Sequence, residues 1–184
     1  MKKWNTAPPA GTRWAMGRAG AYLYAAAQPL VNRFTAARLE IQLEEPLWQP
    51  GSKLVPGLFV RKDPTVTVGA GSEECYVFVK ITEENNTLSN SRGKFVDYTV
   101  ANTWTALDGV PGVYYYNTTV TATDADVKLQ VLVKNEVSFN ENIEQSDMDA
   151  ITADTTKAPK LNFVAYAVQA EGSKDAAEAW AKIG

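Results

Sequence analysis

The chain carries several groups of acidic side chains but no histidine. Without histidine, neither a Ser-His-Asp nucleophile system nor a His-ligated zinc site can be built. Carboxylate chemistry stays open, because glycosidases use two Asp or Glu side chains held about 5 to 10 Å apart, and hard cations bind carboxylate and carbonyl oxygens. The acidic side chains that could serve such chemistry are Glu44-Glu45, Glu73-Glu74, Glu83-Glu84, and the set Glu141, Glu144, Asp147 and Asp149.

The surroundings of these acidic groups favour a structural role. The three Glu-Glu pairs fall at expected strand ends or turns, where solvated charge is common. Residues 140–149 lack the alternating ligands, central glycine and final glutamate of an EF-hand loop. A polar loop or short helix is therefore favoured there over a weak calcium site. We predict no catalytic, cofactor-binding or metal-binding residue, and hence a protein that is not an enzyme.

The amino-acid composition limits the classes of protein and of partner that are possible. A chain of 184 residues is most simply one domain with room for a real core. Its net charge of -3 and its scattered Lys and Arg argue against nucleic acid as a partner. The single Cys75 excludes an internal disulfide. No run of apolar residues approaches the length of a membrane helix, so we expect no stable membrane span.

The stretch from Lys62 to Lys80 predicts a β-hairpin. Apolar side chains recur at every second position in 65–68 and again in 75–79, a period that is typical of half-buried strands. Between them, Gly69-Ala70-Gly71-Ser72 provides a glycine-containing turn at which the chain can reverse.

Similar patterns along the chain predict an all-β protein. Leu39, Ile41 and Leu43 alternate with polar residues in a first strand. Val113 to Tyr116 contains three consecutive tyrosines, which are more typical of a cross-strand aromatic cluster than of a ligand platform. The other expected strands are 58–60, 65–68, 75–81, 95–100, 104–107, 127–133 and 161–168.

Two short helices are expected late in the chain. One lies near 144–152, inside a polar stretch that runs from 135 to 160. The other covers 176–183, where Asp175 and Glu178 resemble a capping box and Trp180 anchors the helix to the body. Together these elements predict a jelly-roll-like antiparallel β-sandwich with one or two short helices, including a C-terminal helix.

The N-terminus divides into two segments ahead of this domain. Residues 1–20 contain prolines and arginines instead of the apolar core of a signal peptide, so we interpret them as a flexible or non-native leader. Residues 21–33 are more apolar and form a separate segment. Residues 34–184 are expected to form the single β-sandwich domain.

Several of these stretches resemble one family. The chain is similar to the TasA/camelysin family of exported Gram-positive surface proteins, which are processed by a dedicated SipW-type signal peptidase. The resemblance extends over residues 20–184. It consists of sequence patterns of strands and turns rather than catalytic motifs. The similar stretches are Gly20 to Leu23, Asn32 to Thr35, Leu39 to Pro46, Pro56-Gly57 with Lys62 to Pro64, Ala165 to Ala170, and Ala179-Trp180.

The resemblance implies an extracellular structural protein. Its members form cell-surface or biofilm-matrix fibres, in which the N-terminal segment of one subunit inserts as a strand into an incomplete jelly roll of the next. In this chain the implied donor segment is 21–33, with Leu23, Leu30 and Val31 as the side chains to be buried. The implied partners are further copies of the chain and other matrix proteins. Camelysin-like members carry a metallopeptidase label, and this chain has no histidine for the zinc site that such an activity needs.

Two other functions stay open at this point. A monomeric β-sandwich could bind carbohydrate or a surface through Trp48, Trp104 and Tyr114 to Tyr116, provided that these aromatic rings are exposed in a row. A carboxylate-based hydrolase would need two carboxylates that converge in a cleft, with Glu73, Glu74 and Asp149 as the side chains to examine.

Overall fold

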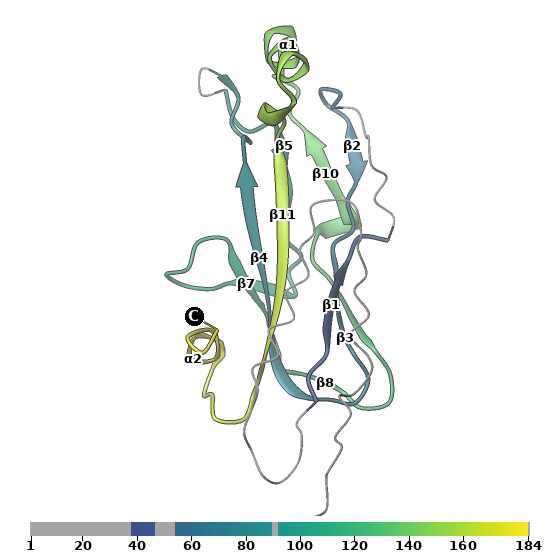
Figure 1. Ribbon diagram of the computed structural model, residues 1–184, viewed down its shortest axis with the longest axis vertical. Coiled ribbons are helices and arrows are strands. Elements are labelled where there is room, and N and C mark those ends of the chain that lie inside the picture. Colours follow the sequence, from purple (N-terminus) through teal and green to yellow (C-terminus); the bar gives the residue numbers. More distant parts are fainter. Residues whose placement is uncertain (1–37, 47–53, 90–91, 184) are drawn as a thin grey trace, which may run out of the picture.

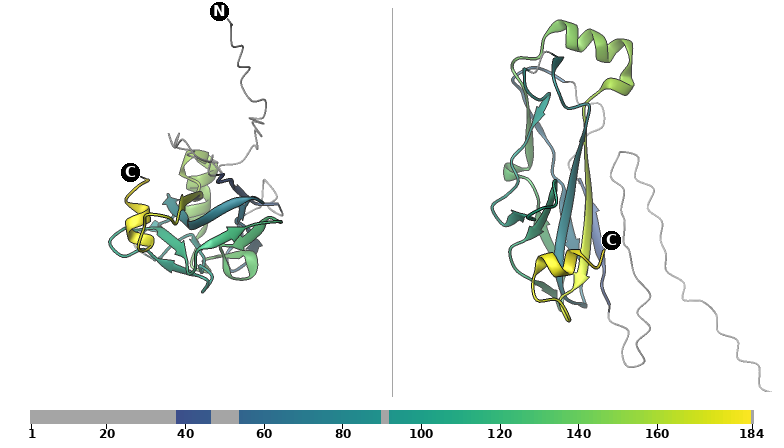
Figure 2. Two further views of the ribbon diagram at one scale, coloured as in Figure 1. Left: turned by 90° about the horizontal axis from the view of Figure 1, so that it is seen from below. Right: turned by 90° about the vertical axis from the view of Figure 1, so that its left-hand side faces the viewer.

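The computed structural model describes residues 38–46, 54–89 and 92–183. Within them the chain forms an elongated body of antiparallel sheets, with one short helix near each end of the long axis (Figures 1 and 2). The predicted class, an all-β antiparallel sandwich with short helices that include a C-terminal one, is confirmed. No helix among the described residues has the length and apolar character that crossing a membrane requires.

Sheet A is a three-stranded sheet in the order β1-β3-β9. It consists of β1 (Ile41–Glu44), β3 (Thr65–Val68) and β9 (Val127–Gln130). In β1 the burial alternates strictly, because Ile41 and Leu43 face the core while their neighbours face solvent. The first strand and the strand 65–68 are therefore found where the alternation predicted them.

Sheet C is the largest sheet and has the order β11-β4-β7-β6, with β8 also paired to β4. Its strands are β11 (Lys160–Gln169), β4 (Ser72–Glu84), β7 (Val113–Tyr116), β6 (Trp104–Ala106) and β8 (Val120–Ala122). The 13-residue β4 pairs with β11 on one side and with β7 and β8 on the other. It is the central strand of the molecule.

Sheet B closes one end of the sandwich. It contains β2 (Phe59–Arg61), β10 (Glu136–Phe139) and β5 (Val96–Asp97), in the order β2-β10-β5. β10, which lies in the expected polar stretch, and β8 (Val120–Ala122) were not predicted as strands. Both strands are short, so neither offers enough alternation to separate it from a loop.

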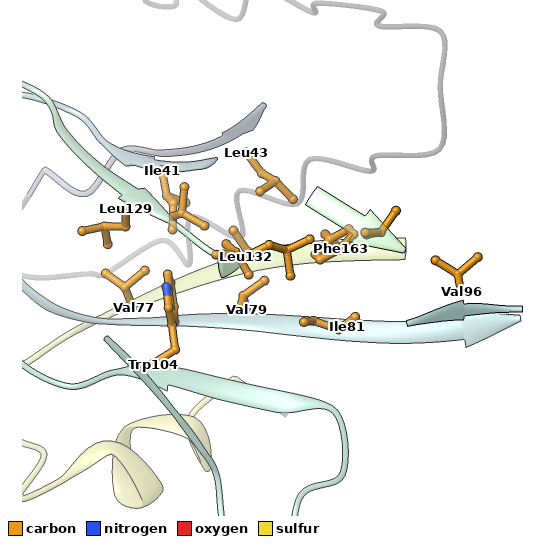
Figure 3. Close-up of a cluster of buried hydrophobic side chains, with 14 of the residues drawn as sticks. Ile41, Leu43, Val77, Val79, Ile81, Val96, Trp104, Leu129, Leu132 and Phe163 are labelled. Carbon is orange, nitrogen blue, oxygen red and sulfur yellow. The ribbon is translucent and has the colours of Figure 1, made fainter. Parts of the chain in front are cut away.

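One continuous core lies between sheets A and C. The inward side chains of β1, β3 and β9 pack against those of β4 and β11, and Trp104 closes the cluster from β6. Figure 3 shows this arrangement, with Val77, Val79 and Ile81 in a row along β4 opposite Leu43 and Leu129.

The predicted hairpin within 62–80 is wrong. Both strands exist, but β3 pairs with β1 and β9 while β4 pairs with β11, β7 and β8. The turn at 69–72 therefore carries the chain from one sheet to the facing sheet. Its hydrogen bonds fit this crossing, because Gly71 donates its N–H to the Ala122 carbonyl instead of closing a ladder between β3 and β4.

The two helices cover different parts of the sandwich. Helix α1 (Gln145–Ala153) lies at the end that contains sheet B, in agreement with the helix predicted near 144–152 (Figure 1). Helix α2 (Ala176–Trp180) packs on the outer face of sheet C, where Asp175 accepts a hydrogen bond from the Glu178 N–H at 2.9 Å. The Asp175 half of the predicted capping box is therefore present, whereas the Glu178 carboxylate accepts from the Lys174 N–H at 3.0 Å instead of the Asp175 N–H. The helix is shorter than 176–183.

Trp180 anchors α2 as predicted. Its ring lies 5.2 Å from that of Phe78 and 5.3 Å from that of Tyr166, measured between centroids. These contacts form a second apolar cluster on the outer face of sheet C. Sheet C is thus covered on both faces, since odd-numbered residues of β4 face the main core and Phe78 faces α2.

We expect Gly112 to be the least replaceable glycine of the turn before β7. It has φ +76°, and a Cβ added there would lie 2.5 Å from the Ile81 carbonyl oxygen. Gly112→Ala should therefore lower the free energy of unfolding by about 2–4 kcal/mol, from the left-handed backbone and the clash together.

Gly109 provides the matched control. It has φ +71° and nothing within 4 Å of an added Cβ, so Gly109→Ala should cost only about 1 kcal/mol. Urea unfolding of both variants measures the difference. Equal losses would contradict the close approach of Gly112 to β4.

Candidate functional site: the open edge of strand β11

Strand β11 is a long, regular edge strand. All 10 of its residues pair with β4, and the register runs from Lys160↔Glu84 to Gln169↔Cys75 without a shift. On its other side, no described strand pairs with it. An edge of this length presents a row of backbone donors and acceptors to any strand that approaches it.

The register shows which backbone groups point outward. Ala170 donates its N–H to the Glu74 carbonyl, in line with the β4-β11 register, so even-numbered residues of β11 exchange hydrogen bonds with β4. The odd-numbered residues direct their N–H and C=O groups away from β4. Within the described part of the chain, none of these groups has a hydrogen-bond partner at positions Leu161, Phe163, Ala165, Ala167 and Gln169.

The opposite sheet has a similar edge at β1. Among the described strands β1 pairs with β3 alone, and the Gly69 N–H bonds to the Glu40 carbonyl in the same register. The alternation then turns the backbone groups of Ile41 and Leu43 outward. β1 and β11 contact each other without pairing, so two edges from facing sheets lie side by side (Figure 1).

The usual protections of a sheet edge are weak on β11. Natural edges are protected by proline, bulges, inward charges or shortness. Here Pro159 precedes the strand and Lys160 occupies its first position, while the rest of the strand carries no charge and no bulge. Phe163 and Ala165 are buried, so the side chains next to the open edge belong to the core.

The predicted donor residues lie outside the described part of the chain. This applies to Leu23, Leu30 and Val31, to the whole segment 21–33, and to the leader 1–20. The structure therefore describes the edge that could receive a strand, and the donor stays a prediction. Sequence reasoning found β11 as a strand but missed its position at an edge, because edge position depends on tertiary pairing.

The carboxylates weighed for hydrolysis do not converge. Glu73 and Glu74 are exposed at the start of β4, whereas Asp149 is exposed on α1 at the other end of the molecule (Figure 1). No group of three or more potential metal-ligating side chains gathers among the described residues. Near these glutamates, burial and then the charge of Glu74 raise the pKa of the Cys75 thiol to about 11, which disfavours the nucleophilic thiolate.

Asp147 makes structural contacts that were not predicted from the sequence. The Asp147 carboxylate accepts hydrogen bonds from Ser89 Oγ (2.7 Å), Arg92 Nη2 (2.7 Å) and the Glu144 N–H (2.9 Å). The Ser89 bond and the Glu144 bond, with a further contribution from Arg92, lower the pKa of Asp147 to about 2. This carboxylate therefore ties the first turn of α1 to the segment that follows β4.

Glu83 collects a second set of partners at the end of β4. Its side chain accepts hydrogen bonds from Lys94 Nζ (2.8 Å), Asn86 Nδ2 (2.8 Å) and Tyr98 Oη (2.9 Å). Burial alone would raise the pKa of Glu83, but these hydrogen bonds together lower it. The Glu83-Glu84 pair is thus occupied by structural contacts, as its position at a strand end suggested.

The aromatic residues do not form an exposed row among the described residues. Trp104 is buried, and its indole N–H donates to the Gln130 carbonyl at 2.8 Å. Tyr116 packs edge-on against its cross-strand neighbour Trp104 with ring centroids 5.3 Å apart, whereas Tyr115 packs on the opposite face of sheet C. Trp48 lies outside the described residues.

Comparison with known proteins adds no assignment, since no family model, curated protein or solved structure matches the chain.

Asp147→Asn should lower the thermal unfolding temperature by a few degrees at pH 7, because it removes the anion that holds Arg92 and the α1 N-terminus. The pKa of Asp147 falls from 3.8 in a model peptide to about 2 in the fold. Its contribution is therefore complete above about pH 4 and is lost as the pH falls toward 2.

Asp149→Asn is the matched control on the same helix. Asp149 is exposed and bonds only to Gln145 among the described side chains, so its replacement should shift the unfolding temperature by about 1 °C or less. Calorimetric scans between pH 2 and pH 7 check both variants. An Asp147→Asn effect that persists unchanged at pH 2 would refute the assigned role.

Proposed function

We propose that this protein is a secreted, non-enzymatic structural subunit of extracellular fibres at the cell surface or in a biofilm matrix. Each copy adds an N-terminal strand to the open edge of β11 in the next copy. The observation that carries the proposal is the row of outward backbone groups along β11 that have no partner among the described residues. The resemblance to the TasA/camelysin family supports it.

The chemistry of the edge supports strand addition over side-chain recognition. Backbone hydrogen bonds supply affinity in this mode, and alternate side chains of the added strand supply specificity. A strand beside β11 would lie next to β1 as well, so its apolar side chains would extend the core that Phe163 and Ile41 already line. Such an addition would cover two exposed edges at once.

The same geometry accounts for growth into a fibre. A contact between the N-terminal segment of one copy and β11 of another joins two different surfaces, so it is heterologous. A heterologous contact that does not close into a ring adds subunits without limit. The proposed donor is 21–33, in which Leu23, Leu30 and Val31 supply the apolar side chains. Pro29 removes one N–H from this donor, which leaves its other backbone groups for pairing.

Removal of the donor should abolish assembly. We expect the chain that begins at Ala21 to form filaments in negative-stain electron microscopy, and the chain that begins at Phe34, which lacks the donor, to stay monodisperse. Size-exclusion chromatography of both samples at equal concentration provides the control. Monodisperse particles from both chains, at high concentration and across pH, would overturn the proposal.

Blocking the acceptor should have the same result without loss of the fold. The Ala167 N–H points to the open edge, so Ala167→Pro removes an unused donor and places a ring where an added strand must lie. We expect the unfolding free energy to fall by about 1 kcal/mol or less, and filaments to disappear.

Val168→Pro is the contrasting variant one position away. The Val168 N–H belongs to the set that bonds to β4, so its loss should cost about 3 kcal/mol or more. Urea unfolding and electron microscopy are measured on both variants. Normal filaments from a folded Ala167→Pro protein would show that β11 is not the acceptor.

A further inference from the structure

The two most exposed large apolar side chains among the described residues lie in or beside β2. Phe59 is 66% exposed and Leu58 is 52% exposed, and Val55 in the turn before them is 39% exposed. The register of sheet B places Phe59 beside Ser138 and then Asp97, on the face away from the core. The cross-strand neighbours of the Phe59 ring on that face are therefore polar, and the ring is not part of the core.

Strand β2 is also an edge strand. Among the described strands it pairs with β10 alone, at the margin of sheet B (Figure 1). The Lys62 N–H donates to the Asn135 carbonyl at 2.8 Å, so the even-numbered residues of this stretch exchange hydrogen bonds with β10. By alternation, Phe59 and Arg61 direct their N–H and C=O groups away from β10.

The side chains of Phe59 and Arg61 are complementary to each other. They lie on the same face of β2, and both are exposed. The Arg61 guanidinium has no hydrogen-bond or ion-pair partner among the described residues. A guanidinium and an aromatic ring attract each other within about 6 Å, so each of these side chains is a suitable neighbour for the other.

A second copy of the chain in antiparallel orientation satisfies both side chains. With a two-fold axis at Val60, Phe59 of each copy lies opposite Arg61 of the other. Both residues point outward, so each such pair exchanges its N–H and C=O bonds. Other registers fit less well, because pairing Arg61 with itself opposes like charges and a shift by one residue opposes an outward residue to one that already bonds to β10.

We propose that β2 is a second association edge, which pairs with β2 of another copy about a two-fold axis. This contact joins identical surfaces, so it closes as a dimer, unlike the open-ended contact proposed at β11. The paired strands are short, so we expect a dissociation constant of about 0.1–1 mM.

In a fibre, the same weak contact would repeat along the whole length. Many β2 pairs between neighbouring fibres would act together and bundle the fibres. This consequence rests on the proposed function, whereas the dimer itself does not.

Disulfide cross-linking of the full chain with oxidised glutathione tests the orientation and the register. Val60→Cys places two thiols at the axis, where opposed Cα atoms about 4.5 Å apart allow a disulfide. Arg61→Cys places them roughly 8 Å apart, beyond the limit of about 7 Å. We expect Val60→Cys to yield about tenfold more linked dimer, although position 61 is the more exposed. The wild type, with its buried Cys75, gives the background.

Charge replacement at Phe59 tests the complementarity. Sedimentation equilibrium is measured up to about 1 mM on the full chain carrying Ala167→Pro, which removes the proposed head-to-tail growth. Phe59→Lys opposes two cations across the axis and should weaken the dimer about tenfold or more. Phe59→Glu is the matched control, because it faces Arg61 with the opposite charge and should keep the affinity within about threefold. Urea unfolding checks that both variants fold.

Three results would contradict the proposal. Arg61→Cys could cross-link as efficiently as Val60→Cys, Phe59→Lys and Phe59→Glu could weaken association equally, or the protein could stay monomeric at about 1 mM. The last result would mean that another segment of the chain or a different protein covers this edge. If Val60→Cys fails to fold, the two Phe59 variants decide. A Val60→Cys cross-link that persists in an Ala167→Pro protein without filaments separates β2 from the β11 edge, and its loss there would refute an independent dimer.

Discussion

The ladder between β4 and β11 is the interaction on which the rest of the structure depends. It is the longest strand pairing among the described residues, and it anchors the main core through Val77, Val79 and Phe163. The opposite face of the same ladder holds α2 through Phe78 and Tyr166. Because β4 uses both of its edges, β11 is the terminal strand of sheet C, and its second edge has no partner strand among the described residues.

Because β11 lies at the edge of sheet C, the candidate site consists of its backbone N–H and C=O groups instead of side chains. No cluster of catalytic side chains forms among the described residues, and the acidic residues that might have served bind neighbouring groups or face solvent. Asp147 and Glu83 hold the end of the sandwich near α1, where they join segments that are distant in sequence. The outer edges of β1 and β11, by contrast, have no partner strand in the described part of the chain, and the proposed association would use their backbone groups.

Much of the fold could be predicted from the sequence, because strand alternation reports which side chains face the core. That signal found β1, β3, β7 and β11. It does not report which strands pair, and the hairpin prediction failed for this reason. Val66 and Val77 both face inward, which is equally true of strands in one sheet and of strands in facing sheets. The short strands β8 and β10 contain too few alternating apolar and polar residues to be predicted.

The candidate sites were harder to predict than the strands. The edge position of β11 follows from pairings between segments about 80 residues apart. The cluster at Asp147 joins residues 55 and 58 positions apart in the chain. Only the three-dimensional arrangement brings such groups together.

Residue-resolved amide hydrogen exchange along β11 tests the central claim most directly. In the chain that begins at Phe34, the outward N–H groups of Phe163, Ala165 and Ala167 should exchange about 100-fold faster than those of Val164 and Tyr166, which bond to β4. In filaments of the longer chain, all of these amides should be protected. Uniform protection along β11 in the shorter chain would contradict an open edge.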